Sequence, residues 1–95
     1  MKFRLDMDAE TRDLVRHLPP EPKHRVKQGL RRIADAPSVG KPLQEELAGL
    51  FSHRIGTLRI VYAVSAAKAA VQIVAIGPRR TIYEILARSQ GARHR

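Results

Sequence analysis

The second half of the chain contains three strand-like segments separated by two short turns, and this run constrains the fold more than any other feature. Residues 51–55 and 58–64 are separated by Gly56 and Thr57, and residues 70–76 follow the small-residue turn SAAKA. In segments of this length, alternating apolar and polar side chains are typical of strands. Because turns this short join antiparallel neighbours, we predict a three-stranded antiparallel meander.

The first half of the chain predicts one strand and two helices. Residues 2–6 alternate as a short strand, and Asp8 offers an N-cap for a helix over residues 9–18. Two prolines end that helix, and an apolar stripe at helical spacing predicts a second helix over residues 21–36. The segment APSVGKP that follows is typical of turns. We therefore predict an α+β fold: an antiparallel helical hairpin packs on one face of a four-stranded sheet, and the other face is free for a ligand or partner.

A chain of 95 residues that is 43% hydrophobic suits one domain with a single core. We assign residues 1–88 to this domain and expect residues 89–95 (SQGARHR) to form a flexible basic tail, because they are almost entirely polar. The chain has no cysteine, so the fold depends on its core. No segment approaches the roughly 18 apolar residues of a membrane span, and we expect a cytoplasmic protein without a membrane partner.

The charge of the chain points to an anionic partner. Eighteen lysines and arginines oppose nine acidic residues, which gives a formal net charge of +9. Such an excess costs self-repulsion and is offset when a polyanion or an acidic protein binds. A basic protein that is merely soluble is the alternative.

Four arginines are the best candidates for contact with that anion. Alternation along the strands places Arg54 and Arg59 on the same sheet face across the Gly56 turn, which is unfavourable unless an anion lies between them. Arg79 and Arg80 follow the end of the next strand. Arginine donates paired hydrogen bonds to phosphate and stays charged, so the pattern predicts a phosphate-binding groove. The alternative is ordinary solvated surface charge.

The remaining polar residues narrow the chemistry. The four histidines show no metal-ligand spacing and no acidic cluster near them, so we expect no metal and no cofactor. Cleavage of RNA by its own 2′-OH needs a group that orients or deprotonates this hydroxyl, and cations for the charged phosphorane. Tyr83 is the candidate for the first role, and the arginines are the candidates for the second. Ser52, His53 and Arg80 are further candidates for RNA or phosphate binding.

Two motifs match a known family pattern. Residues 43–64, LQEELAGLFSHRIGTLRIVYAV, are followed by AVQIVAIG and then by PRRTIYE at residues 78–84. This pattern resembles the RelE/ParE superfamily of toxins from bacterial type II toxin-antitoxin systems over essentially the whole chain. The resemblance implies a RelE-like fold and neutralisation by a tightly bound cognate antitoxin, which allows a toxin-antitoxin hetero-oligomer.

For the RelE branch, the resemblance implies an mRNA interferase. Such an endoribonuclease cleaves messenger RNA on the ribosome without a metal, leaves a 2′,3′-cyclic phosphate, inhibits translation and arrests growth. The positions that match the family's catalytic residues are Arg54, Arg59, Arg79 and Tyr83. The chain departs from the pattern at Ser52, where a lysine is frequent, and at Pro78, where a histidine or lysine is frequent.

Two other functions remain open. The ParE branch shares the fold but is associated with inhibition of DNA gyrase, so a non-enzymatic ParE-like toxin is the alternative. A basic structural or regulatory module without toxicity is the third possibility. In each case we expect an acidic or amphipathic partner segment to cover the basic surface.

Overall fold

The structure is a computed structural model that describes residues 2–93, with side chains described as far as Ala87. It confirms the α+β class. Three α-helices are present among the described residues: α1 (Ala9–Arg16), α2 (Pro20–Asp35) and α3 (Arg79–Arg93). The strands are β1 (Arg4–Met7), β2 (Lys41–Pro42), β3 (Leu50–Ile55), β4 (Leu58–Ser65) and β5 (Ala70–Pro78). None of the helices described is long and apolar enough to cross a membrane.

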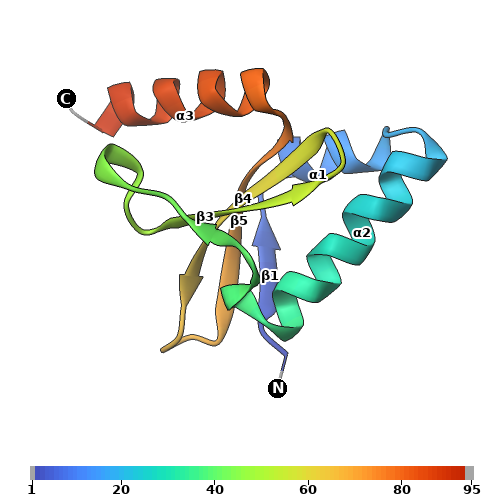
Figure 1. Cartoon of the computed structure of the whole chain (residues 1–95), viewed down its shortest axis with the longest axis horizontal. Coiled ribbons are helices and arrows are strands. Elements are labelled where there is room, and N and C mark those ends of the chain that lie inside the picture. The colour runs from blue at the N-terminus through green and yellow to red at the C-terminus, as the bar shows by residue number, and fades with distance from the viewer. Residues whose placement is uncertain (1, 94–95) are drawn as a thin grey trace.

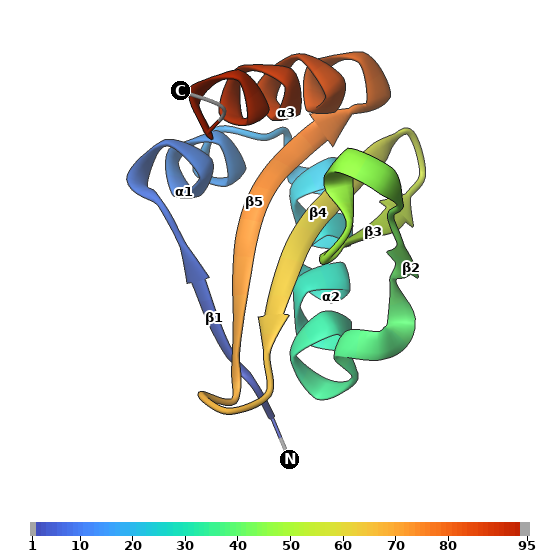
Figure 2. The same cartoon turned by 90° about the vertical axis from the view of Figure 1, so that its left-hand side faces the viewer.

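The strands form one mixed sheet in the order β1-β5-β4-β3-β2. The predicted meander is confirmed, because β3 pairs antiparallel with β4 and β4 with β5. β1 pairs parallel with β5, so the first strand lies beside the last (Figure 2). The sheet has five strands where we expected four. The additional strand is β2, which lies in the segment that we assigned to a turn and pairs with β3. A strand of only two residues is too short to produce a period in the sequence.

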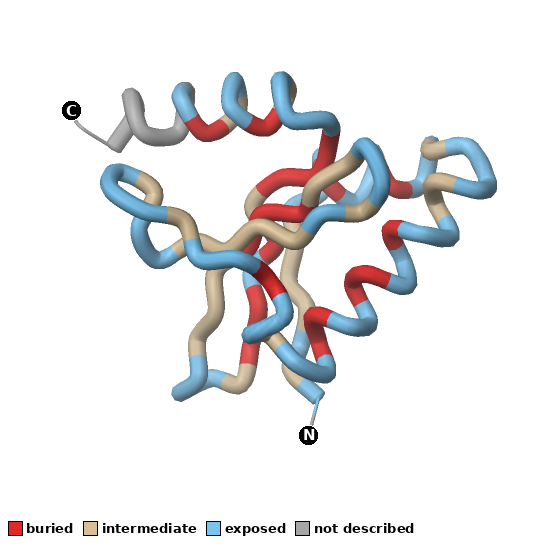
Figure 3. Tube along the Cα trace, in the orientation of Figure 1, coloured by how far each residue is buried: buried red, intermediate tan, exposed pale blue. Residues whose placement is uncertain are grey.

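The main core lies between the sheet and α2. Val26 and Ile33 of α2 are fully buried against Ile60, Tyr62 and neighbouring strand residues. Figure 3 shows the buried positions of α2 on the side of the helix that faces the sheet. Burial of each such side chain stabilises the fold by about 1.5–3 kcal/mol. The predicted helix-facing side of the meander is therefore correct.

The opposite face of the sheet is not free, contrary to our expectation. α3 lies across it (Figure 1), and Ile82 and Leu86 of this helix form a second buried cluster with Val61 and Ala75. The two helix residues are four apart, so they lie on the same side of α3. Residues 89–93 of the expected tail are helical in α3, while residues 94–95 lie outside the described residues. The flexibility of the tail stays a prediction.

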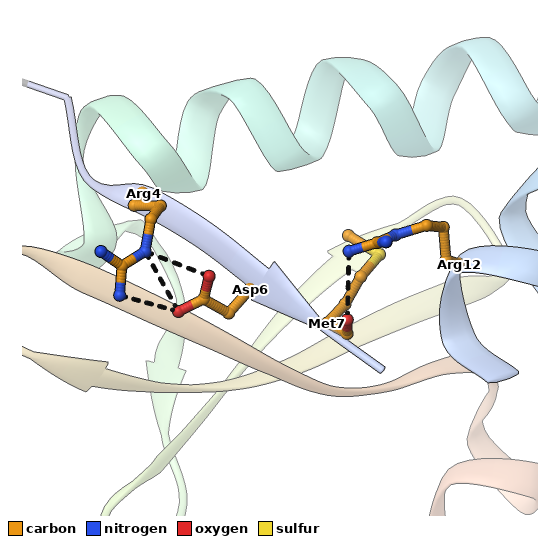
Figure 4. Close-up of polar contacts among 4 residues, drawn as sticks. All are labelled: Arg4, Asp6, Met7 and Arg12. Atoms are coloured by element: carbon orange, nitrogen blue, oxygen red, sulfur yellow. Dashed lines mark hydrogen bonds and ion pairs between the residues drawn. The ribbon is translucent and has the colours of Figure 1, made fainter. Parts of the chain in front are cut away.

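The N-terminal elements are tied together by short polar contacts. Asp8 caps α1 as predicted, because its carboxylate accepts a hydrogen bond of 2.8 Å from the Thr11 amide. Hydrogen bonding by the Thr11 side chain, and after it by the Thr11 amide, lowers the pKa of Asp8. Arg12 donates to the Met7 carbonyl at 3.3 Å, and Arg4 pairs with Asp6 at 3.1 Å along the edge strand β1 (Figure 4). Helices α1 and α2 are joined by a short loop and are inclined to each other (Figure 1), where we expected them to lie antiparallel.

A buried tyrosine holds the segment that leads into β2. The Tyr62 hydroxyl donates to the Pro37 carbonyl at 2.6 Å and accepts from the Gly40 amide at 2.9 Å. Burial raises the pKa of Tyr62, so the hydroxyl keeps its proton and can donate. Phe51 stacks on the ring at 5.6 Å between centroids. This anchor fixes the path of the chain before Lys41.

Candidate functional site

Two arginines face each other across the β3–β4 turn. Arg54 and Arg59 are direct partners in the antiparallel register, and Arg59 is in turn the partner of Gly77 on β5. Directly paired residues point to the same side of a sheet, which here is the side that α3 covers further along. Arg54 is exposed and Arg59 is half-buried. The predicted pairing of these two like charges is confirmed.

The first turn of α3 brings two more candidates to the same end of the sheet. The helix begins at Arg79, directly after Pro78 ends β5. A Cβ atom on Gly77 would lie 3.5 Å from the Thr81 side chain, so this turn rests against the strand residue that neighbours Arg59. The Arg79 guanidinium lies 5.5 Å from the centre of the Tyr83 ring, and Tyr83 is 52% exposed.

The helical repeat determines which way Arg79 and Tyr83 project. Ile82 and Leu86 face the sheet, and Ile85 lies on the flank of α3 that faces α1, where it lines a depression with Leu14. At about 100° per residue, Arg79 and Tyr83 project from the opposite flank, away from α1. Arg80 is exposed, and its position on the helical wheel is turned further from the sheet.

Lys41 is a basic residue that the sequence did not reveal as part of this site. In the register of β2 and β3 it is the direct partner of Ser52, and Ser52 is the partner of Val61. Lys41 and Ser52 therefore share the sheet face that carries Arg54, which is two residues further along β3. Lys41 is exposed. Its segment has the composition of a turn, so only the strand pairing identifies its position.

His53 does not join the arginine pair. It is the partner of Ile60 and points to the side of the sheet that α2 covers, opposite to Ser52 and Arg54. Partial burial lowers the pKa of His53, and the positive charge of Arg32 on α2 lowers it further. The expectation of a half-buried strand residue is correct. A direct role beside Arg59 is not supported by this orientation.

The face formed by Lys41, Ser52, Arg54, Arg59, Arg79 and Tyr83, here called the basic face, carries uncompensated charge. The ion pairs between described residues lie on β1, α1 and α2, and none involves a cation of the basic face. A depression of about 270 Å³ lies on the other flank of α3, and Asp8 and Glu10 contribute to its lining. Its carboxylates make it a poor site for a phosphate. Within residues 2–87, whose side chains are described, no three potential metal-ligating side chains gather in one place.

Comparison with known proteins gives one family match and one curated relative. A family model described as the ParE toxin of the type II toxin-antitoxin system parDE matches residues 2–83. Toxin RelG of Mycobacterium tuberculosis (strain ATCC 25618 / H37Rv) is 47% identical over 45 residues, which are 47% of this chain and 52% of that protein. The alignment therefore spans about half the length of this curated relative.

Solved structures resemble the whole fold. The toxin-antitoxin complex RelBE2 from Mycobacterium tuberculosis contains a chain that is 31% identical, with a TM-score of 0.73, over 83% of this chain and 100% of that one. The isolated RelE toxin of Escherichia coli is 20% identical, with a TM-score of 0.70, over 90% of this chain and 97% of its own. The second likeness shows the fold alone.

Proposed function

The chain belongs to the RelE/ParE superfamily of toxins from type II toxin-antitoxin systems, and from this premise we propose that it is a ribosome-dependent endoribonuclease that cleaves messenger RNA. Several of the similar solved structures are toxin-antitoxin complexes, which supports a cognate antitoxin as the partner of this chain. Cleavage on the ribosome would place its activity in the cytoplasm and inhibit translation.

The proposal rests on the position of Arg59, which lies between Arg54 on β3 and the strand end that leads into α3. Arg59 is the register partner of both Arg54 and Gly77, and the helix that starts two residues after Gly77 carries Arg79 and Tyr83. Like charges that face each other are destabilising by up to about 1 kcal/mol. A bound phosphate would relieve that cost, which favours a binding role over ordinary solvation.

These residue types suit metal-independent cleavage of RNA. The ribose 2′-oxygen attacks the adjacent phosphorus, the bond from phosphorus to the 5′-oxygen breaks, and a 2′,3′-cyclic phosphate and a 5′-hydroxyl result. We assign the stabilisation of the charged phosphorane to Arg54, Arg59 and Arg79, because arginine keeps its charge and donates paired hydrogen bonds. Tyr83 orients the attacking 2′-OH, and its oxygen accepts the 2′-OH proton as the phenol gives its own proton to water. The leaving oxygen takes a proton from water.

The proposal is tested with purified protein, purified ribosomes and a defined message. We expect cleavage of ribosome-bound message, fragments that end in a 2′,3′-cyclic phosphate, and no cleavage by a variant that combines Arg79→Ala with Tyr83→Phe. Intact message under conditions in which the wild-type chain arrests growth would overturn the nuclease assignment.

A gyrase assay distinguishes the ParE-like alternative from the proposed nuclease. The family model that matches the chain is that of the ParE toxin. The same preparations are therefore tested for inhibition of DNA supercoiling. We expect no inhibition. If the wild-type chain and the double variant inhibited gyrase equally well, the basic face would have no catalytic role and the ParE-like function would replace our proposal.

A further inference from the structure

A second group of basic side chains lies between α2 and β3, on the opposite side of the sheet from the basic face. Arg25, Gln28, Gly29 and Arg32 follow the spacing i, i+3, i+4, i+7, so they form one stripe along α2. Together with His53, Arg54 and Ile55 they line a depression of about 190 Å³. The residues in this depression are called the α2 pocket below.

Gly29 brings the helix close to the strand and so shapes the α2 pocket. A Cβ atom at this position would collide with the Ile55 side chain and would lie 3.4 Å from Ile60 Cδ1. The lack of a side chain lets α2 sit directly on the end of β3. The polar side chains on either side of Gly29 consequently stand at the rim of one hollow beside His53.

The lining of the α2 pocket provides hydrogen-bond donors without a carboxylate. Arg25 is held by Glu21 at 3.0 Å, one helical turn earlier, and Arg32 takes part in none of the ion pairs between described residues. The Gln28 amide and the His53 ring add neutral donors. Three guanidinium groups, counting that of Arg54, and two neutral donors around a small open hollow suit a phosphate group.

We propose that the α2 pocket is a second phosphate-binding site, formed mainly by Arg32, Gln28 and His53, which holds an RNA backbone phosphate. The identity of this ligand rests on the proposed function, whereas the affinity for phosphate does not. Arg54 belongs to the basic face and also lines the α2 pocket, so the two sites meet at the end of β3. RNA bound there would be held on both sides of the sheet edge.

The test uses the full chain and two probes, inorganic phosphate and a short single-stranded RNA with a non-cleavable 2′-deoxy linkage. Binding is followed through the NMR signals of the His53 ring and by direct titration. We expect both probes to shift the His53 signals, and Arg32→Gln to weaken phosphate binding 5-fold to 10-fold. The matched control is Arg31→Gln, which removes the same charge from the adjacent exposed position outside the pocket and should have less than a 2-fold effect.

Three outcomes would overturn parts of the proposal. Unchanged His53 signals at tens of millimolar phosphate, or equal losses in both variants, would refute a phosphate site. A shift with phosphate but not with RNA would refute the RNA ligand. Because binding is measured without cleavage, a chain that inhibits gyrase and cuts no message can still show the phosphate site, so failure of the two proposals is distinguishable. Matching urea midpoints of the two variants show that both are folded.

Discussion

The Arg79 guanidinium lies 5.5 Å from the centre of the Tyr83 ring, one helical turn further along α3. A cation over an aromatic ring is stabilised by about 0.5–1 kcal/mol at an exposed site. The contact holds both side chains on the flank of α3 that faces away from α1. In the function that we propose, the ring of Tyr83 positions Arg79 and its hydroxyl acts on the substrate.

Tyr83→Phe separates these two roles, because it keeps the ring under Arg79 and removes only the hydroxyl. We expect cleavage of ribosome-bound message to fall at least 100-fold, in the range of a lost general base, while the urea midpoint is unchanged. Tyr83→Leu, which also removes the ring, should lose more. Rates are measured in single-turnover cleavage, and wild-type activity in Tyr83→Phe would contradict the assigned role.

Removal of one charge from the Arg54–Arg59 pair should change stability and activity in opposite directions. Arg54→Gln relieves the repulsion between directly opposed charges, so we expect the free energy of unfolding to rise by up to about 0.5 kcal/mol. Cleavage should fall at least 10-fold. Urea titrations at low and high salt measure the first effect, and the gain should shrink as salt screens the charges. A loss of stability at low salt would show that the two arginines do not repel.

Lys41 should supply part of the positive charge of the basic face, because it is paired with Ser52. We expect Lys41→Gln to weaken binding of ribosome-bound message 3-fold to 10-fold. Adding Ser52→Lys to that variant places a cation at the partner position and should restore most of the loss. Lys68→Gln, in the exposed turn between β4 and β5, is the matched control. Failure of the rescue would argue against a shared site.

Loss of the Tyr62 hydroxyl should destabilise the fold without touching the basic face directly. In Tyr62→Phe, the Gly40 amide and the Pro37 carbonyl lose their partner. An unsatisfied buried polar group costs about 1–3 kcal/mol, and we expect a decrease of that size in urea unfolding. The aromatic stacking with Phe51 is preserved, so packing alone would not explain the decrease. A change below about 0.5 kcal/mol would show that water replaces both contacts.

His53 should make stability depend on pH in a predictable direction. Its pKa in the folded chain is lowered by burial and by Arg32, whereas in the unfolded chain it is about 6.5. The unfolded chain therefore binds the proton more readily, so stability is full above about pH 6.5 and falls as the pH drops from there to the folded pKa. The variant His53→Gln should lack this part of the pH dependence in urea titrations from pH 5 to 8. An unchanged slope would contradict the prediction.

The sequence was sufficient for the parts of the fold that have a clear period. The alternation in residues 51–55 and 58–64 with a turn at Gly56 predicted the meander, and with it the Arg54–Arg59 pair. Asp8 was recognised as a cap because aspartate before an amphipathic segment is favoured there. These features depend on interactions between neighbours in sequence or across one tight turn.

Features that depend on tertiary packing could not be predicted. Ile73 and Ile76 both reach the main core although their spacing breaks the period of a strand, because a bulge shifts the register between β4 and β5. α3 has few apolar positions, and it covers the sheet face that we expected to be free for a ligand or partner. The place of Lys41 follows only from the pairing of a two-residue strand. Each of these is decided by contacts between distant segments.

The parallel pairing of β1 with β5 affects when the chain can fold during its synthesis. Arg4 pairs with Ala70 and Met7 pairs with Ile73. The first strand therefore cannot pair with β5 until most of the chain has been synthesised. Contacts between such distant segments are slow to form because loop closure must come first. β5 also links the arginine pair to α3. We therefore expect that a nascent chain does not inhibit the ribosome that synthesises it, because the fold and the basic face form together only near the end of translation.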